Sequence, residues 1–294
     1  MSLYLAMDVG GTSIKYGVID DEGNVSNQGK IVTPDSLDKM YAEMEKIYHD
    51  LNQEVEGLAL SMPGAVDSEV GVIKGSSALD YIHGPNIKED LQARLNLKVT
   101  LENDANCAAL AEVWKGAASD VDDCMFIVSG TGIGGAVVKN RLIHRGKHLH
   151  GGEFGYMVAL NDIENDEYIS WSEAGSTVAV VRAVAKELGV EPETLDGKEI
   201  FDHASENPVY QKYVNQYFSV LAMGIYNLQY VYDPEKIVIG GTISARDDLL
   251  EQLEKHLDKI YTKIPHAKIR PQVVKCKFAN QANLIGAVYN FINS

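Results

Sequence analysis

The sequence predicts an α/β protein made of two related halves. Short apolar runs that end in glycine-rich turns alternate with longer segments whose apolar residues recur at helical spacing. One strand-and-turn pattern occurs twice, as LAMDVGGTSIKYGVIDDEGN and as FIVSGTGIGGAVVKNRL, about 120 residues apart. A chain of 294 residues is long enough for two ordinary domains. We therefore expect an internal duplication with a boundary near residues 115–120.

The N-terminal half opens with a strand, a glycine-rich hairpin and a second strand over residues 3–20. Residues 36–54 then place apolar side chains at helical spacing, with Ser36 as the expected N-cap. Further elements follow in order: a buried strand that breaks at Pro63-Gly64, a strand over 97–101, and a helix from Asp104 to near Gly116.

The C-terminal half repeats the strand and glycine turn and then becomes more helical. Helices are expected over 174–188 and 209–232, and the second is apolar on nearly every face in its later part, which favours burial. Asp233-Pro234 ends that helix. A buried strand in EKIVIGGTIS and helices in LLEQLEKHLDKIYTKI and NLIGAVYNFIN complete the chain.

Composition and charge limit the kinds of partner. The chain has 42 acidic and 26 basic residues, a formal charge of −16, which opposes binding to nucleic acid or an anionic membrane. Its 3 cysteines, Cys107, Cys124 and Cys276, form no CxxC pair, so we expect small buried thiols rather than disulfides or a thiolate zinc cluster. No signal peptide or membrane span is evident, which predicts a cytoplasmic protein.

The second glycine turn contains Gly130, Gly132 and Gly135, which together spell GxGxxG. In a dinucleotide-binding unit the third glycine opens a helix, because the pyrophosphate sits on that helix's N-terminus. Here Gly135 is followed by AVVKN, which is short, β-branched and strand-like, so the sequence disfavours a dinucleotide site. We expect instead a hairpin whose tip offers backbone N–H groups and a threonine hydroxyl to a phosphate.

The first glycine turn, in DVGGTSIK, adds the carboxylate of Asp8 and the ammonium group of Lys15. It is not a Walker A loop, which needs a lysine directly after the last glycine. Two tight hairpins without a ligand are the alternative interpretation. Two copies that each carry threonine favour a phosphate site over that alternative.

Four motifs, DVGGTSIKYGVID, SMPGAVD, ENDANCAALAE and SGTGIGGAVV, resemble in order and spacing the ROK family of sugar kinases and repressors, over nearly the whole chain. That family belongs to the actin-like ATPase superfamily. The resemblance implies two ribonuclease-H-like domains with a nucleotide and sugar cleft between them. We expect an N-terminal domain at 1–117 and a C-terminal domain at 118–294, with a C-terminal helix able to pack back on the first domain.

The resemblance also implies how ATP and Mg²⁺ bind. Mg²⁺ would bridge the β- and γ-phosphates near Asp8. In IVIGGTIS, Gly240 and Gly241 match the adenosine motif, where glycine leaves room for the nucleoside. The phosphate-binding residues would be Asp8, Gly10, Gly11, Thr12 and Lys15 in the first hairpin, with Thr131 and Gly132 in the second.

Asn103 and Asp104 lie where a predicted strand ends and a predicted helix begins. Such strand ends line the crevice of an open α/β sheet. Phosphorylation of a sugar hydroxyl needs a carboxylate that accepts the hydroxyl proton. From the residues alone, Asp104 suits either this base or a helix N-cap. The match to the ENDAN motif implies that Asp104 is the general base and also touches the sugar, as do Asn103 and, in SMPGAVD, Gly64.

The segment GKHLHGGEFGYMV resembles the family's sugar-binding stretch, which implies sugar contacts from His150 and Glu153. Family members usually continue into a zinc site with a histidine and a cysteine-rich run. Tyr156 stands at the histidine position, and no cysteine lies between 124 and 276. We therefore expect no zinc within 147–172, and a loop held by the packing of three aromatic side chains: Tyr156, Tyr168 and Trp171.

Glu173 in WSEAGS matches a glutamate that contacts sugar hydroxyls in the family. Its position also suits a carboxylate in the first turn of a helix, where the helix dipole favours negative charge. The family's usual Asn-Leu before the sugar loop is Ala78-Leu79 here, so plain glucose is not assumed as the substrate.

The sequence thus predicts an ATP-dependent sugar kinase, which the resemblance makes a homodimer. Glucose, fructose, N-acetylmannosamine and β-glucosides all remain open as acceptors, so the chain would be a glucokinase, a β-glucoside kinase or a related enzyme. The aromatic side chains of the zinc-free loop favour a larger acceptor such as a β-glucoside. The alternative is a sugar-sensing ROK-type regulator or a binding protein without turnover. The first strand begins at residue 3, which leaves no room for the helix-turn-helix of the family's repressors.

Overall fold

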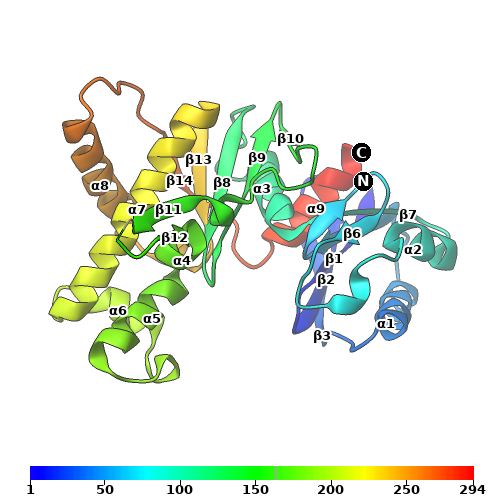
Figure 1. Cartoon of the computed structure of the whole chain (residues 1–294). Coiled ribbons are helices and arrows are strands. Elements are labelled where there is room, and N and C mark those ends of the chain that lie inside the picture. Colours follow the sequence, from blue (N-terminus) through cyan, green and yellow to red (C-terminus); the bar gives the residue numbers. More distant parts are fainter. Residues whose placement is uncertain (163) are drawn as a thin grey trace. The chain divides into compact units, whose positions relative to one another are not determined.

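The computed structural model describes residues 1–162 and 164–294 and divides into two compact units (Figure 1). Unit 1 comprises Met1–Asp120, Arg141–Gly151 and Lys277–Ser294, and unit 2 comprises Val121–Asn140 and Gly152–Cys276. The first change of unit, at residue 120, lies close to the expected boundary. The stretches 141–151 and 277–294 lie with unit 1, whereas the expected ranges placed both in the second domain.

Unit 1 contains a five-stranded sheet in the order β3-β2-β1-β4-β7. β1 is antiparallel to β2, to which a tight turn joins it, and parallel to β4, which the chain reaches from β3 through α1. The strands are β1 (Leu3–Val9), β2 (Ser13–Asp20), β3 (Val25–Val32), β4 (Gly57–Met62) and β7 (Lys98–Asn103), with β5 (Ala65–Asp67) and β6 (Val72–Lys74) as a separate hairpin and β10 at Leu142–Ile143. The helices are α1 (Leu37–His49), η1 (Asp80–Ile82), α2 (Ile87–Leu95), α3 (Asp104–Lys115) and α9 (Ala282–Ile292).

Unit 2 repeats this arrangement. Its strands β8 and β9 form an antiparallel hairpin, and β13 and β14 continue from β8 in parallel, in the order β9-β8-β13-β14. The strands are β8 (Cys124–Ser129), β9 (Ile133–Lys139), β11 (Val158–Asp162), β12 (Glu167–Ser170), β13 (Lys236–Gly240) and β14 (Val273–Lys275). The helices are η2 (Phe154–Tyr156), α4 (Trp171–Gly175), α5 (Thr177–Leu188), η3 (Pro192–Thr194), α6 (Gly197–Asp202), α7 (Pro208–Tyr232), η4 (Thr242–Ala245) and α8 (Leu249–Lys263).

The elements expected from the sequence are present, except that the helix expected over 174–188 is interrupted at Ser176, which is extended and caps α5. The pattern at 36–54 forms α1, although Ser36 occupies its N-cap position without a side-chain hydrogen bond. The segment after Gly135 is the strand β9 and not a helix, as its β-branched residues predict. The buried helix α7 ends at Asp233, whose φ of 51° is left-handed. The order β9-β8-β13-β14 in unit 2 matches the order β2-β1-β4-β7 in unit 1, which confirms the predicted duplication.

Helix α9 packs on the sheet of unit 1 and against α3 (Figure 1). Small side chains permit the close approach, among them Ala6 and Ala59 on the sheet. Gly286 is the tightest point, because a Cβ built there would lie 1.7 Å from the carbonyl oxygen of Cys107 in α3. This contact joins the C-terminal stretch to the helix that begins at Asp104.

The core of unit 2 gathers around α7 and the indole of Trp171, which is fully buried and touches Gly224 and Phe154. The expected packing of three aromatic side chains is wrong for two of them, since Tyr156 is 78% exposed and Tyr168 is 66% exposed. Tyr156 lies in η2, which has 3 residues, and Tyr168 in β12, which has 4, and among the described residues neither ring joins the core cluster of unit 2. Ile163, within the expected zinc-free loop, lies outside the described residues.

Two further expectations concern the thiols and the charges. Cys107 and Cys124 are buried as expected, but Cys276 is only half-buried and lies 3.4 Å from the hydroxyl of Ser244.

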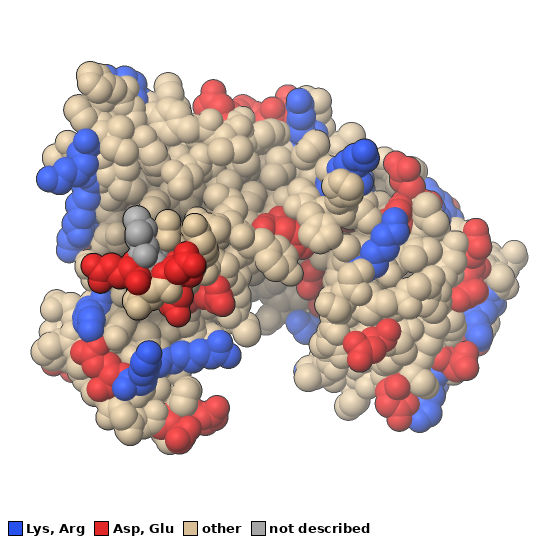
Figure 2. All heavy atoms as spheres, in the orientation of Figure 1, with Lys and Arg blue, Asp and Glu red and all other residues tan. Residues whose placement is uncertain are grey.

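Figure 2 shows acidic side chains gathered at the tip of the β11–β12 hairpin, where Glu164, Asp166 and Glu167 are exposed. Within the described residues, no helix is long and apolar enough to cross a bilayer.

The close packing at Gly286 makes a direct prediction about stability. Gly286→Ala is expected to lower the free energy of unfolding by roughly 3 kcal/mol, because the clash with backbone exceeds the gain of about 1 kcal/mol from alanine's helix propensity. Urea unfolding followed by circular dichroism measures it. Gly197→Ala, at the start of α6, is the control, since its Cβ would meet only the methyl of Val181 at 3.3 Å. Equal stability of the two variants would contradict the packing.

Candidate active site

The first glycine turn connects β1 to β2 and is closed by a hydrogen bond from the Gly10 N–H to the Ser13 carbonyl at 3.0 Å. The hydroxyl of Thr33 donates to the carbonyl of Gly10 at 2.6 Å, which fixes the base of the turn. Gly11 and Thr12 at the tip are exposed. Their backbone N–H groups are therefore accessible to an anion, as the sequence predicts.

The second glycine turn, between β8 and β9, is anchored in the same way. Gly130 N–H donates to the Gly132 carbonyl at 3.0 Å, and the Thr177 hydroxyl donates to the Gly130 carbonyl at 2.7 Å. The tip residue Thr131 is exposed. Thr33 and Thr177 thus play equivalent parts in the two turns. Neither threonine can be recognised from the sequence of the turn, since each lies far along the chain from the turn that it holds.

Gly240 and Gly241 end β13 beside the second turn. A Cβ on Gly240 would lie 2.6 Å from the ring of Phe126, and one on Gly241 would lie 2.3 Å from the carbonyl oxygen of Ser129. Gly241 also has a φ of +83°, which glycine adopts readily. Glycine at these positions therefore lets η4 start close to the strand that carries the Gly130 turn.

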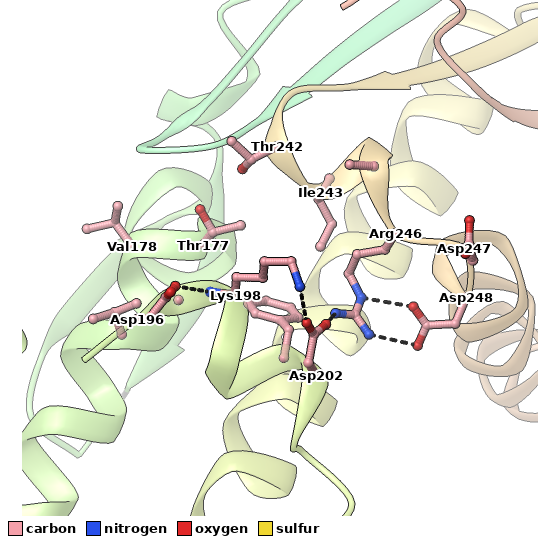
Figure 3. Close-up of a pocket in the computed structure, with 14 residues that line it drawn as sticks. Thr177, Val178, Asp196, Lys198, Asp202, Thr242, Ile243, Arg246, Asp247 and Asp248 are labelled. Carbon is pink, nitrogen blue, oxygen red and sulfur yellow. Dashed lines mark hydrogen bonds and ion pairs between the residues drawn. The ribbon is translucent and has the colours of Figure 1, made fainter.

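A cavity of about 820 Å³ in unit 2 opens beside Gly241 (Figure 3). Thr177, which anchors the second turn, lines one side of it, and Thr242 and Ile243 of η4 line another. The aromatic ring of Phe201 and the side chains of Val178 and Val181 give it an apolar wall. Its volume and mixed lining are typical of small-molecule sites.

The polar side of this cavity is a connected chain of charges (Figure 3). Arg246 donates to Asp248 at 2.8 Å and to Asp202 at 2.7 Å, and Lys198 also pairs with Asp202. The pairing with Lys198, and next that with Arg246, lowers the pKa of Asp202. Four aspartates against two basic side chains line the cavity, so negative charge is in excess. Such a lining suits the hydroxyl and amino groups of a nucleoside and disfavours its phosphates.

The junction of β7 and α3 holds the predicted base. Asn103 and not Asp104 is the N-cap of α3, since its Oδ1 accepts the Asn106 N–H at 3.1 Å. This finding excludes the N-cap alternative for Asp104, which is the first residue of the helix. The Nδ2 of Asn103 donates to Asp104 Oδ1 and to the Gly64 carbonyl, both at 3.0 Å. One amide thus links Gly64, Asn103 and Asp104, three of the predicted sugar residues of unit 1.

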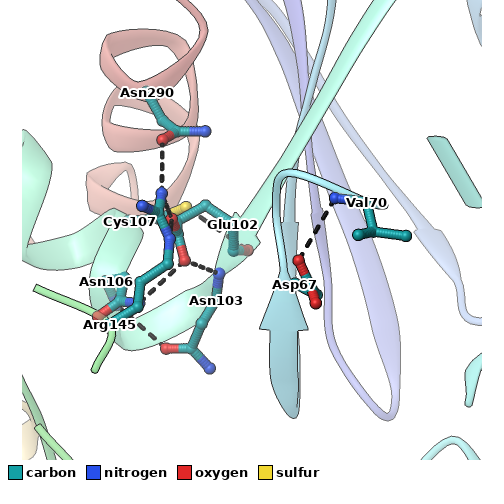
Figure 4. Close-up of polar contacts among 8 residues, drawn as sticks. All are labelled: Asp67, Val70, Glu102, Asn103, Asn106, Cys107, Arg145 and Asn290. Atoms are coloured by element: carbon teal, nitrogen blue, oxygen red, sulfur yellow. Dashed lines mark hydrogen bonds and ion pairs between the residues drawn. The ribbon is translucent and has the colours of Figure 1, made fainter. Parts of the chain in front are cut away.

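Glu102 precedes Asn103 on β7, and its carboxylate is fully buried (Figure 4). Its Oε1 accepts the Asn103 N–H at 2.8 Å and the Asn106 side-chain N–H at 2.9 Å. Its Oε2 accepts two hydrogen bonds from the guanidinium of Arg145, that from Nε at 2.9 Å. A buried charge is tolerated only when it is paired and hydrogen-bonded in this way.

Asp8 lies at the end of β1, directly opposite Lys15 on β2. Its Oδ1 accepts hydrogen bonds from the Ser61 hydroxyl and the Asn283 side chain, both at 2.9 Å. These two donors fix the direction of the carboxylate. Asn283 belongs to α9, and nothing in the sequence near Asp8 signals this contact.

The remaining predicted sugar residues divide between the units. His150 is exposed in unit 1, where its Nδ1 lies 2.6 Å from the His148 carbonyl. Glu153 in unit 2 is exposed and precedes η2. Glu173 forms a capping box with Ser170, whose hydroxyl and backbone N–H lower the pKa of Glu173. Glu173 therefore lies in the first turn of a helix, which is the alternative that its position in the sequence suggests.

Two sheets of equal strand order, each with a threonine-anchored glycine turn beside β1 or β8, define an actin-like ATPase fold. The sequence model of the ROK family matches residues 4–293. The chain is 34% identical over 293 residues to the β-glucoside kinase of Listeria innocua, across 98% of this chain and 96% of that protein. The chain therefore belongs to the ROK family, and the predicted family and fold are confirmed.

Solved structures agree. A ROK family protein from Streptococcus pneumoniae in complex with sucrose aligns with a TM-score of 0.92 at 36% identity, over 99% of this chain and 98% of that one. A ROK family glucokinase from Streptomyces griseus in complex with glucose and AMPPNP aligns with a TM-score of 0.77 at 25% identity, over 97% of this chain and 98% of that one.

The threonine anchors make a testable prediction. Thr33→Val and Thr177→Val each remove one hydroxyl that donates to a glycine carbonyl, and each should lower the free energy of unfolding by about 1 kcal/mol. Thr131→Val, at the exposed tip of the second turn, is the matched control and should leave stability unchanged. Urea denaturation compares the three variants. Loss of stability in the control alone would show that the anchors are misassigned.

Proposed function

We propose that the chain transfers the γ-phosphoryl group of ATP to a hydroxyl group of a β-glucoside. The chain is a sugar kinase on the evidence of its relatives, which include the β-glucoside kinase of Listeria innocua at 34% identity. The proposal for this chain's own residues rests on one observation above the others. At the β7–α3 junction the amide of Asn103 fixes the carboxylate of Asp104 at 3.0 Å.

Asp104 is proposed as the general base. Its Oδ1 accepts hydrogen bonds from the Ala105 N–H at 2.8 Å and from Asn103, which orient the carboxylate. A carboxylate so held can accept the proton of a sugar hydroxyl as that oxygen attacks the γ-phosphorus. Asn103, Gly64 and His150 of unit 1, with Glu153 and Glu173 of unit 2, are proposed to bind the sugar.

The two glycine turns are proposed to bind the phosphates of ATP through Gly10, Gly11, Thr12 and Lys15, and through Thr131 and Gly132. The 820 Å³ cavity beside Gly240 and Gly241 is proposed to hold the adenosine. Its excess of aspartates supports this assignment, because carboxylates accept hydrogen bonds from ribose hydroxyls and repel phosphate. The phosphates would then lie toward the Gly130 turn, to which Thr177 of the cavity wall is bonded.

Mg²⁺ is proposed to bind through ATP with Asp8 nearby. The donor set fits, since magnesium prefers carboxylate oxygens and usually retains water and phosphate ligands. Ser61 and Asn283 hold Asp8 in one orientation for this purpose. When bound, the ion supplies positive charge to the phosphate oxygens. The homodimer, the cytoplasmic location, and the absence of zinc and of nucleic-acid or membrane partners stay predictions.

The β-glucoside acceptor is proposed from the exposed aromatic side chains. Tyr156 and Tyr168 are 78% and 66% exposed, so their rings are accessible to a ligand. Faces of aromatic rings stack on sugar rings, so these side chains can hold a second ring beyond the phosphorylated glucose. The sucrose in the related Streptococcus pneumoniae structure is also a two-ring sugar.

The alternative, a ROK-type regulator or a binding protein without turnover, is less well supported. Curated relatives that match almost the whole chain include the β-glucoside kinases of Listeria innocua and Klebsiella pneumoniae. The Asp8, Lys15 and Asp104 side chains that phosphoryl transfer needs are all present.

Asp104→Asn tests the base. The amide keeps the shape of the carboxylate but cannot accept the proton, so kcat for cellobiose should fall by about 10³-fold. Coupled ADP assays measure the rate, and circular dichroism checks the fold. Asp38→Asn is the matched control, a 95% exposed carboxylate in the first turn of α1. Activity of Asp104→Asn within tenfold of the wild type would refute the assignment.

Tyr168→Ala tests the acceptor. If the ring stacks on the second sugar, kcat/KM should fall about fivefold for cellobiose, which corresponds to about 1 kcal/mol, and stay unchanged for glucose. Tyr230→Ala, a 48% exposed tyrosine of α7, serves as the control and should alter neither. An equal fall for both sugars in Tyr168→Ala would mean that the ring acts on the fold and not on the acceptor.

A further inference from the structure

Unit 1 contains a second cavity, of about 460 Å³, that includes none of the residues proposed above for ATP or sugar. It lies among β7, α2, α9 and the segment that carries Arg145. Because side chains alternate along a strand, Lys98, Thr100 and Glu102 share one face of β7, while Val99 and Leu101 face the core. Lys98 and Thr100 line the cavity. Glu102 accepts hydrogen bonds from Arg145, and Arg145 also lines the cavity.

Basic side chains outnumber acidic ones in the lining of the cavity. Lys88, Lys98 and Arg145 line it with one acidic side chain, Glu69, and Arg145 is paired with Glu102. The Lys88 ammonium donates to the backbone oxygen of Glu69 at 3.1 Å, and the Lys98 ammonium donates to the backbone oxygens of Phe291 and Ser294 at 3.4 and 3.1 Å. These contacts hold the two ammonium groups at the cavity wall, where they attract an anion.

Thr100 is the second, independent sign of a ligand. Its side chain lines the cavity and it is only 5% exposed, yet its Oγ1 has no hydrogen-bond partner among the described residues. Leaving a buried hydroxyl unpaired costs about 1–3 kcal/mol. Asn290 of α9 and Asn293, which directly follows that helix, add amide groups to the same wall. Ammonium groups with amides and one unpaired hydroxyl suit a ligand that carries both a phosphate and hydroxyl groups.

We infer that this cavity is a regulatory site for a sugar phosphate, the class of molecule that the proposed reaction forms. The identity of the ligand rests on the proposed function, whereas the existence of an anion site does not. Arg145 connects the site to Asp104. Its guanidinium bonds Glu102 and also approaches Asn290 Oδ1 at 3.4 Å, and Glu102 in turn holds the Asn103 N–H. A phosphate beside Arg145 shares the guanidinium with Glu102, and so acts on the carboxylate that holds the start of α3.

Isothermal titration of the full chain with glucose 6-phosphate, inorganic phosphate and glucose tests the site. Glucose 6-phosphate should bind the wild type more tightly than phosphate does, because phosphate lacks the hydroxyl groups. Thr100→Val should weaken that binding about tenfold without loss of stability, since it removes a hydroxyl that the free protein leaves unpaired. Its unfolding free energy, measured without ligand, should equal or exceed that of the wild type.

Lys98→Gln is the second variant and should weaken the binding of both phosphate compounds, with Lys263→Gln on α8 as the matched control. No binding by the wild type, equal affinity in all four proteins, or phosphate binding as tightly as glucose 6-phosphate would overturn the inference. The titration needs no turnover, so a failure of the proposed kinase reaction is seen separately, as absence of ADP.

A kinetic readout separates this site from product binding beside Asp104. Glucose 6-phosphate should change kcat in the wild type and have much less effect in Thr100→Val at the same concentration. An equal effect in both proteins would place the ligand at the catalytic residues and contradict a second site.

Discussion

The arrangement of unit 1 depends on one buried carboxylate, that of Glu102. A charge with no exposed surface must be compensated from within the protein, and three groups do so: the Asn103 N–H, the Asn106 amide and the Arg145 guanidinium. These three contacts fix the first turn of α3 and tie the segment at 141–151 to it. The placement of Asp104, and the connection to the second cavity, both follow from that requirement.

The duplication gives each half the same turn and lets each half hold a different partner. Thr33 and Thr177 anchor equivalent glycine carbonyls, and the tips of both turns are exposed. The surroundings then diverge. Unit 1 places carboxylates and amides at the ends of β1 and β7, which suits proton transfer to and from a sugar, while unit 2 opens a cavity beside Gly241 that suits a nucleoside.

Local patterns predicted the strands, the helices and the glycine turns, because periodicity and turn residues act over a few positions. The choice between Asn103 and Asp104 as N-cap was beyond the sequence, since both residue types cap helices equally well. Contacts such as Asn283 with Asp8, 275 positions apart, arise only from the folded chain. The exposure of Tyr156 and Tyr168 was missed for a similar reason, because aromatic type predicts burial on average and not for a short hairpin.

The proposed reaction consumes ATP to phosphorylate a β-glucoside. It is tested most directly by the initial rate of ADP release with Mg²⁺ and ATP, without acceptor and with glucose, fructose, N-acetylmannosamine or cellobiose. The structure predicts slow release without acceptor and the largest kcat/KM for cellobiose, with a phosphorylated disaccharide as the product. ADP release that no sugar stimulates, from a protein that nevertheless binds these sugars, would contradict the account.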